Sequence, residues 1–508
     1  MSDNLLLAID SGLTVTKAVV FDRHGTEVAV GERRITVHYP HPHHVERDMD
    51  EAWAATAAAI RDALAAPGVD AARVRGVGVT AHGDGLYPVT ADLRPAGPGI
   101  LSLDSRAVAV LERWQRVGVA DEALTRTGQT PHVSAPATLL AWLAEERPEC
   151  LARTRWVMAC KDWIRLCLTG EVATDPTEAS ESFTDVETQD YSAEALRLFG
   201  LSALEPCLPP VVACDASAGR VSTEVAAETG LPAGTPVATG LHDVTAAAIG
   251  LGNIHPGELT VVAGTYSINE TISTHPARNP SVACRNGFRP GEWMNMAISP
   301  ASSANIDWVL REFCQREQVE AEARGGSVFD TLQPEIERAA EDRAGVFFHP
   351  FLYGSPLSDR ASGGLFGLKG WHTRGHVLLA VLEGIAYNHR THVDALKAAF
   401  PLERARAAGG GVRNPVLRQR FADNFRLPVG TVSANEVSAL GAAVCAGVAG
   451  GVYEGIDTGV AEAVHPAAPH EPDPQGAEAA DEGYALYRQL AKALEPLWPK
   501  LSDREVRQ

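Results

Sequence analysis

Two distant stretches of the chain share one pattern, and this repeat limits the possible folds more than any other feature. Residues 5–22 read LLLAIDSGLTVTKAVVFD and residues 258–273 read ELTVVAGTYSINETIS. In each, an apolar strand runs into a short turn that contains glycine, and a second apolar strand follows, which is typical of an antiparallel pair. A chain of 508 residues is also too long for one ordinary hydrophobic core. We therefore expect two domains built on one plan, residues 1–245 and residues 246–508.

The hydrophobic pattern around these pairs alternates between strands and helices. In the first half it predicts strands at 5–10, 16–22, 27–35, 74–81 and 235–243, and a helix at 48–66. In the second half it predicts a helix at 374–398, a strand, turn and helix over 405–425, a surface segment at 455–480 and a final helix at 481–499. Such an order indicates an α/β layer fold.

Asp10 ends the first strand, and a carboxylate in that place has two interpretations. It can belong to an ordinary hairpin turn, because Asp and Gly both tolerate unusual backbone angles. It can also meet a metal-bound phosphate at the strand end. Glycine-rich turns follow strands at 10–17, 264–267 and 408–414, and Asp243 ends another strand. One such turn is usually only a turn, but three in corresponding places fit a nucleotide held for phosphoryl transfer.

Composition and motifs exclude several other classes of protein. A net charge of −20 argues against nucleic-acid or anionic-membrane partners. The eight cysteines show no CxxC spacing, and the chain has neither a targeting signal nor an apolar run long enough to span a membrane, so we expect a cytoplasmic protein. The P-loop pattern is absent, and the glycines of GVGVTA (76–81) lie inside a predicted strand, which argues against dinucleotide binding.

Four longer segments resemble a known family. GGLFGLKGWHTRGHVLLAVLEG (363–384) matches the C-terminal signature of the FGGY carbohydrate kinases, and CKDWIRLCLTG (160–170) resembles their N-terminal signature. GGGVRNPVLRQRFAD (409–423) resembles their adenosine segment, and EVSALGAAVCAG (436–447) the helix after it. The resemblance covers essentially the whole chain. It implies an α/β protein with two actin-like (ribonuclease H-like) ATPase domains, a cleft between them, and ATP and Mg²⁺ as cofactors.

The resemblance also implies roles for individual residues. Asp243 would be the general base facing the sugar's primary hydroxyl, although an aspartate that only caps a helix is the alternative, and Asp10 would hold Mg²⁺. Lys17 would aid phosphate binding or, equally, be a solvated strand lysine. The remaining nucleotide residues would be Gly12, Thr14, Gly264, Thr265, Gly409, Gly410, Gly411 and Asn414, and the substrate would contact His82, Asp84, Asp104, Arg106 and Asp243.

Departures from the family pattern bear on the substrate. Leu13 stands where a phosphate-turn threonine is usual, and Ser102 and Leu103 replace a Trp-Asn pair of xylulose kinases. His82 and Asp84 replace the glutamine and histidine of D-xylulose kinases. The combination is similar to the L-xylulose and erythritol kinase branches. We therefore expect a homodimeric kinase that phosphorylates a primary hydroxyl of a small ketose such as L-xylulose, with erythritol, another polyol or a sugar acid as alternatives. A non-metabolic actin-fold ATPase or sugar sensor is the alternative of another class.

Overall fold

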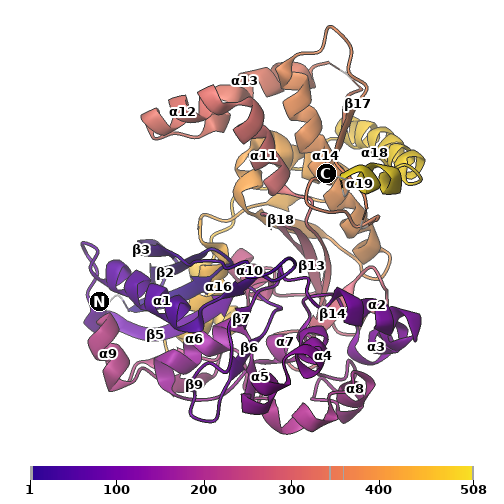
Figure 1. Ribbon diagram of the computed structural model, residues 1–508. Helices are drawn as coiled ribbons and strands as arrows, with labels where there is room; N and C mark the ends of the chain where they lie inside the picture. The colour runs from indigo at the N-terminus through magenta and orange to yellow at the C-terminus, as the bar shows by residue number, and fades with distance from the viewer. Residues whose placement is uncertain (1–3, 343–344, 359, 506–508) are drawn as a thin grey trace. The chain divides into compact units, whose positions relative to one another are not determined.

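The computed structural model describes residues 4–342, 345–358 and 360–505 (Figure 1). The chain divides into two compact units. The first unit comprises the residues up to Pro256 together with Ile272–Asn295 and Val432–Pro466. The second comprises Gly257–Thr271, Met296–Thr431 and the residues from Ala467 onward.

The first unit holds the following elements: β1 (Leu5–Ser11), β2 (Val15–Asp22), β3 (Glu27–Arg34), β4 (Glu46–Arg47), α1 (Met49–Leu64), β5 (Val74–Ala81), β6 (Tyr87–Val89), β7 (Gly99–Ile100), α2 (Val108–Arg116), α3 (Val119–Thr127), α4 (Pro136–Glu146), α5 (Pro148–Arg153), β8 (Trp156–Met158), α6 (Cys160–Thr169), α7 (Pro176–Ala179), α8 (Ala193–Leu198), β9 (Ser217–Arg220), α9 (Thr223–Thr229), β10 (Pro236–Ala238), β11 (Leu241–His242), α10 (Asp243–Leu251), β14 (Ala283–Asn286), α16 (Val437–Ala449) and α17 (Ile456–Ala463). The second unit holds β12 (Glu258–Ala263), most of β13 (Ser267–Ser273) and of β15 (Trp293–Ser299), α11 (Ser303–Phe313), α12 (Gln315–Arg324), α13 (Val328–Ala340), β16 (Phe347–His349), β17 (Gly364–Phe366), α14 (Arg374–Lys397), β18 (Arg404–Ala408), α15 (Pro415–Phe425), β19 (Val429–Gly430), α18 (Pro474–Leu494) and α19 (Trp498–Glu505).

The sheet of the first unit has the order β3-β2-β1-β5-β10-β9, and β11 also pairs with β5. Its central strand β1 is buried on both faces, so nearly every residue in it is apolar. Leu5, Leu7 and Ile9 share a hydrophobic core with residues of α1, while Leu6 lies toward α16. The predicted antiparallel start of the fold is confirmed: β1 pairs with β2, and β2 with β3, in antiparallel register.

Two glycines of β5 explain why GVGVTA resembles a nucleotide-binding motif without being one. A Cβ on Gly76 or Gly78 would lie 2.1 or 2.0 Å from a carbonyl oxygen of α16. The glycines therefore let this helix pack directly on the strand. No helix opens after them, because the turn 82–86 follows β5 instead. The rejection of a dinucleotide site therefore agrees with the local structure.

The N-terminal signature segment CKDWIRLCLTG forms α6 and buries an ion-pair cluster at its start. Lys161 is fully buried, and its Nζ lies 2.5 Å from Asp162 and 2.9 Å from Asp175. Burial alone lowers the pKa of Lys161, but the charges of Asp162, Asp175 and Glu178 raise it above the ordinary value. The signature thus supplies a buried cation that holds α6 to the start of α7.

Two predicted boundaries were wrong. The strand expected over 235–243 is split at Gly240, whose φ of 79° breaks it into β10 and β11, and Asp243 begins α10. The stretch 455–480 is largely helical: it contains α17, and α18 begins at Pro474 rather than near 481. Asp473 caps α18, because its side chain accepts a hydrogen bond from the Gly476 N–H.

In the second unit, parallel pairing brings two glycine turns to the same sheet edge. The strands of this unit follow the order β15-β13-β12-β18-β19. β12 runs parallel to β18 with Val262 opposite Ala408, so the turns that begin at Gly264 and Gly409 leave adjacent strands. Gly409 has a φ of 105°, and a Cβ there would lie 2.4 Å from the Ala263 carbonyl oxygen. Only glycine allows these two turns to approach so closely.

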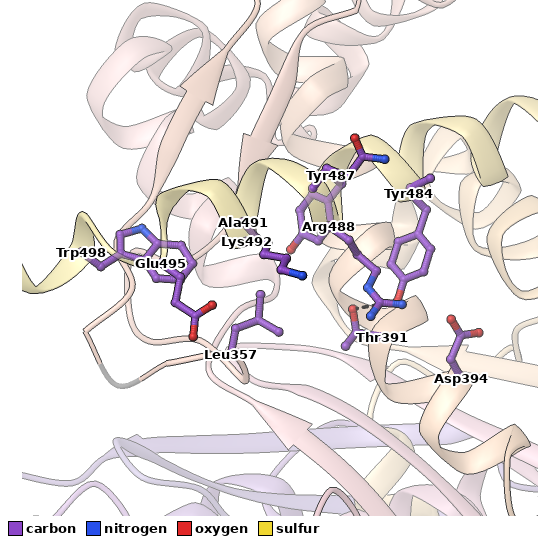
Figure 2. A pocket seen from close by; sticks show the side chains of 12 residues that line it. Leu357, Thr391, Asp394, Tyr484, Tyr487, Arg488, Ala491, Lys492, Glu495 and Trp498 are labelled. Carbon is purple, nitrogen blue, oxygen red and sulfur yellow. Dashed lines mark hydrogen bonds between the residues drawn. The ribbon is translucent and has the colours of Figure 1, made fainter.

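The second unit also has an open pocket of about 580 Å³ that is lined mainly by α18 and α14 (Figure 2). Tyr484 Oη donates to Thr391 Oγ1 across it at 3.2 Å, and Arg488 lies over the Tyr484 ring. None of the residues predicted to bind nucleotide lines this pocket. Among the described residues, no helix is long and apolar enough to cross a membrane.

Candidate active site

Three strand ends of the first unit bring the predicted catalytic residues together. β1, β5 and β11 run parallel, with Asp10 opposite Thr80 and His242 opposite Ala81. Asp10 therefore lies at the end of β1, residues 82–84 follow β5, and Asp243 follows β11. The carboxyl ends of parallel strands are where α/β sheets place their ligands.

Asp10 and Asp243 influence each other electrostatically. Burial, and next the negative charge of Asp10, raise the pKa of Asp243 to about 8. Burial and the charge of Glu436 raise the pKa of Asp10 to about 6, against the effect of Lys17. The Asp243 side chain is still 34% exposed, and the His242 Nε2 atom lies 3.4 Å from its Oδ1. Two such carboxylates together favour a bound cation.

The turn after β5 has an unusual backbone that aims Asp84 at the site. Asp84 has a φ of 55°, in the left-handed region, and Gly85 follows with 82°. A Cβ on Gly83 would lie 1.8 Å from His242 Nε2, so the turn packs directly on the residue before Asp243. Strained backbone of this kind persists where the surroundings hold it in place.

Asp84 is held by side chains from three other segments. Its Oδ1 accepts a 2.9 Å hydrogen bond from Arg285 and lies 3.2 Å from His132 Nε2. Its N–H donates to Glu181 at 2.7 Å, and Arg285 also binds Glu181 and Gln129. Burial would raise the pKa of Asp84, but the charge of Arg285 and the contact with His132 lower it below its ordinary value. The site therefore presents an ionised, fixed carboxylate.

The other predicted substrate residues, His82, Asp104 and Arg106, are buried. His82 is buried and contacts the Tyr87 hydroxyl at 3.1 Å, and burial lowers its pKa to about 3. Asp104 has no exposed surface, and its carboxylate binds the Val45 N–H and Arg106. Arg106 also pairs with Glu46 at 2.8 Å. The Asp104 carboxylate is therefore bound by protein groups and is not exposed to solvent.

The turn after β1, which is predicted to bind phosphate, is held by Arg47. This fully buried arginine donates from Nη2 to the carbonyl oxygens of Gly12, at 2.9 Å, and Leu13. Gly12 N–H donates to the Val15 carbonyl oxygen at 2.9 Å, and Thr14 is exposed. Lys17 is neither free nor merely solvated, since its Nζ lies 2.7 Å from Glu436.

The predicted nucleotide residues of the second unit cluster at the carboxyl ends of β12 and β18. Gly264 and Thr265 follow β12, and the Gly264 carbonyl oxygen accepts a hydrogen bond from the Ser303 N–H at 2.9 Å. Gly409 and Gly410 are exposed, whereas Gly411 is buried against Ser303. Asn414 is almost fully buried: its Oδ1 caps α15 through the Val416 N–H, and its Nδ2 donates to Gln333. Its contact with a nucleotide stays a prediction.

Comparison with known families agrees with this geometry. The N-terminal domain model of the FGGY family of carbohydrate kinases matches residues 5–250, and the C-terminal domain model matches residues 259–450. The chain belongs to the FGGY family of carbohydrate kinases.

Individual members of the FGGY family are similar over nearly the whole chain. The L-xylulose/3-keto-L-gulonate kinase of Escherichia coli (strain K12) is 31% identical, covering 98% of this chain and 99% of its own. The erythritol kinase of Brucella abortus (strain 2308) is 30% identical, covering 98% of both chains. The crystal structure of xylulose kinase from Rhodospirillum rubrum superposes with a TM-score of 0.84 at 27% identity, covering 97% of this chain and 100% of its own.

These comparisons confirm the predicted family, the two-domain actin-like ATPase fold and an ATP-dependent sugar kinase. They do not favour the alternative of a non-metabolic ATPase or a sugar sensor. Asp10 and Asp243 lie at the ends of β1 and β11, which both pair with β5, and their roles stay predictions.

The site of this FGGY kinase suits Mg²⁺ that is bound together with a nucleotide. Among the described residues, no group of three or more His, Cys, Asp or Glu side chains is arranged to hold a metal ion alone. Mg²⁺ usually takes one or two carboxylates and completes its shell with water and phosphate oxygens. The like-charged pair Asp10 and Asp243 fits such a partly protein-bound ion.

Sequence reasoning missed the residues that surround Asp84. Arg285 comes from the short strand β14, and Gln129 and His132 come from the loop before α4. Glu181 lies just after α7, beyond the quoted signature segment. No spacing links these positions to Asp84, so only the folded chain identifies them. Arg47 was missed for the same reason.

Glu178 provides a prediction about stability and pH. Both of its carboxylate oxygens are buried, and burial followed by the negative charge of Glu181 raises its pKa well above the ordinary value. A raised acid pKa means that the native state loses stability as pH rises above the ordinary value, because ionisation is disfavoured only in the fold. We expect Glu178→Gln to raise the unfolding midpoint by about 2 to 4 °C at pH 8, and by less at pH 5.

Thermal unfolding, followed by circular dichroism at both pH values, measures the shift of the unfolding midpoint in Glu178→Gln. Glu149→Gln, on the exposed first turn of α5, is the matched control, and loss of this charge should change the two midpoints by the same small amount. A midpoint for Glu178→Gln that falls at pH 8 contradicts the prediction.

Proposed function

We propose that this FGGY kinase transfers the γ-phosphoryl group of ATP to a primary hydroxyl of a small ketose, with L-xylulose as the first candidate. The similarity to an L-xylulose/3-keto-L-gulonate kinase over nearly the full length supports this substrate class. The observation that carries the proposal is the convergence of Asp10, Asp84 and Asp243 at three parallel strand ends. These carboxylates offer hydrogen-bond acceptors to hydroxyl groups and a base to one of them.

In the proposed mechanism Asp243 orients the acceptor hydroxyl and takes its proton. An aspartate is too weak a base to remove an alcohol's proton early, so it accepts the proton late, as the loose phosphoryl-transfer transition state forms. The raised pKa of Asp243 makes it a better proton acceptor than an ordinary aspartate. Asp84 accepts hydrogen bonds from hydroxyl groups of the same substrate.

The remaining roles concern the nucleotide. Asp10 would hold Mg²⁺, which when bound neutralises charge on the phosphate oxygens. Arg47 keeps the carbonyl oxygens of residues 12 and 13 turned away from an anion, which lets the turn's N–H groups serve phosphate. Gly264, Thr265 and Gly409–Gly411 would also bind the nucleotide. The sugar would contact mostly residues 1–245, and the nucleotide mostly residues 246–450. The homodimer stays a prediction.

The test is ADP release from ATP and Mg²⁺ with L-xylulose, D-xylulose, D-ribulose, erythritol and glycerol. We expect one of these to exceed the others by at least about tenfold in kcat/KM, because one misplaced hydroxyl leaves a site group unpaired. Erythritol is the second candidate, because the erythritol kinase of Brucella abortus (strain 2308) is almost as similar. Release of ADP with none of the five would overturn the proposed substrate class.

A further inference from the structure

Arg285 is the one buried cation in contact with Asp84 among the described residues, and each of its three nitrogens donates a hydrogen bond to a protein group. Nε donates to Gln129 at 3.1 Å, Nη1 to Glu181 at 3.2 Å and Nη2 to Asp84 at 2.9 Å. Its side chain is only 5% exposed. Gln129 is itself fixed, because its Nε2 donates to the Ser180 carbonyl oxygen at 2.6 Å. The guanidinium is therefore buried and holds three protein side chains in place.

Two carboxylates remain partly exposed at this site, beside the exposed imidazole of His132. Asp84 is 20% exposed and Asp243 is 34% exposed, with Asp10 close enough to raise the pKa of Asp243. The other cations near these residues are already paired with acids or carbonyl groups. These are Lys17 with Glu436, Lys161 with Asp162 and Asp175, Arg106 with Asp104 and Glu46, and Arg47 with the carbonyl oxygens of residues 12 and 13.

We propose that Arg285 is a specificity-determining residue, which holds Asp84 as a fixed anion so that the site accepts neutral ketoses or polyols and rejects sugar acids. This inference rests on the proposed function. A carboxylate accepts hydrogen bonds from hydroxyl groups but repels a second carboxylate. Proteins often bind carboxylates through an arginine or lysine that has no other acid partner, and Lys17, Lys161 and Arg285 all have one here.

Glu181 also helps to hold Asp84 in place. It binds both the Asp84 N–H and Arg285, so the unusual backbone at Asp84 and the position of its side chain are set by one buried pair. His132 contacts the same Asp84 oxygen from the exposed side. Without Arg285, Asp84 would lose its main counter-charge and more readily bind a proton. The site would then be less anionic, and its selectivity against acids would fall.

The experiment compares kcat/KM for the best neutral substrate with kcat/KM for D-gluconate and 3-keto-L-gulonate. In the wild-type enzyme we expect the neutral substrate to be favoured by at least about 100-fold. In Arg285→Met we expect KM for the neutral substrate to rise about 30-fold, with a smaller change in kcat, and the neutral-to-acid ratio to fall at least about tenfold. Arg285→Lys, which keeps the charge but not the fork of donors, should recover part of that ratio.

Arg278→Met is the matched control, since this exposed arginine of the same segment pairs only with Glu187 on the surface. It should leave the ratio unchanged. Where Arg285→Met does not fold, Asp84→Asn removes the anion directly and should lower the ratio in the same direction. Wild-type enzyme that uses an acid as well as the neutral substrate overturns the inference and leaves the kinase proposal standing. A ratio that Arg285→Met and Asp84→Asn both leave unchanged also overturns it, and inactivity with every substrate contradicts the proposed function instead.

Discussion

Asp243→Asn should reduce kcat by about 100- to 10,000-fold while KM for the sugar changes only a few-fold. The amide keeps the shape and a hydrogen-bonding oxygen but cannot accept the hydroxyl's proton. Because only ionised Asp243 can act, the wild-type rate should rise with pH on the acidic side of its profile, and the variant should lose that dependence. Single-turnover kinetics with the best substrate, from pH 5 to pH 9, measures both effects.

If Asp243 only stabilised helix α10, Asp243→Asn would keep its activity and would lower the unfolding midpoint. Asp243 lies in the first turn of α10, where a carboxylate favours the helix dipole. However, the raised pKa of Asp243 shows that burial disfavours its ionised form in the fold, so the amide should not lower the unfolding midpoint at pH 8. Asp50→Asn, in the exposed first turn of α1, is the control for loss of a helix-dipole charge. Full activity of Asp243→Asn together with a lowered unfolding midpoint would contradict the proposed mechanism.

Lys161→Met should destabilise the first unit by about 3 to 5 kcal/mol, because it leaves buried carboxylates without their cation. Lys161, Asp162 and Asp175 are all essentially inaccessible to water. Loss of the charge should lower the unfolding midpoint more at pH 8 than at pH 5, since the stranded acids can be neutralised by protons at low pH. Thermal and urea unfolding at both pH values give the measurement.

Adding Asp162→Asn and Asp175→Asn to Lys161→Met should recover part of the lost stability, because no buried charge of the pair then remains. Asn at 175 can still accept the Thr177 N–H hydrogen bond that caps α7. A single variant as stable as the wild type, or a triple variant less stable than the single one, contradicts this account of the signature segment.

The sequence was most informative where a residue's place follows from a local pattern. Asp10 ends a strand buried on both faces, and its position could be predicted from alternation and the turn alone. The start of α18 was missed, although Asp473 and Pro474 form an ordinary helix start, because the Ala- and Glu-rich composition around them is shared by helices and surface loops.

The partners of Asp84 could not be predicted for a different reason. Arg285 reaches Asp84 and Glu181 from strand β14, far along the chain, and an isolated arginine in a short strand has no periodic signature. Likewise the left-handed backbone at Asp84 depends on contacts with residues that the local sequence does not contain. Long-range contacts of this kind appear only when the chain has folded.

The close packing of α16 on Gly76 and Gly78 has a consequence for synthesis of the chain. Ribosomes make β1 and β5 first, but the helix that covers this face of their sheet begins only at Val437. Until then Leu6 and its neighbours lack their partner, and the nascent chain must keep an apolar surface from self-association. Truncation before residue 437 should therefore give an aggregation-prone product rather than a smaller working kinase. The sheet of the first unit can finish folding only after α16 has been synthesised.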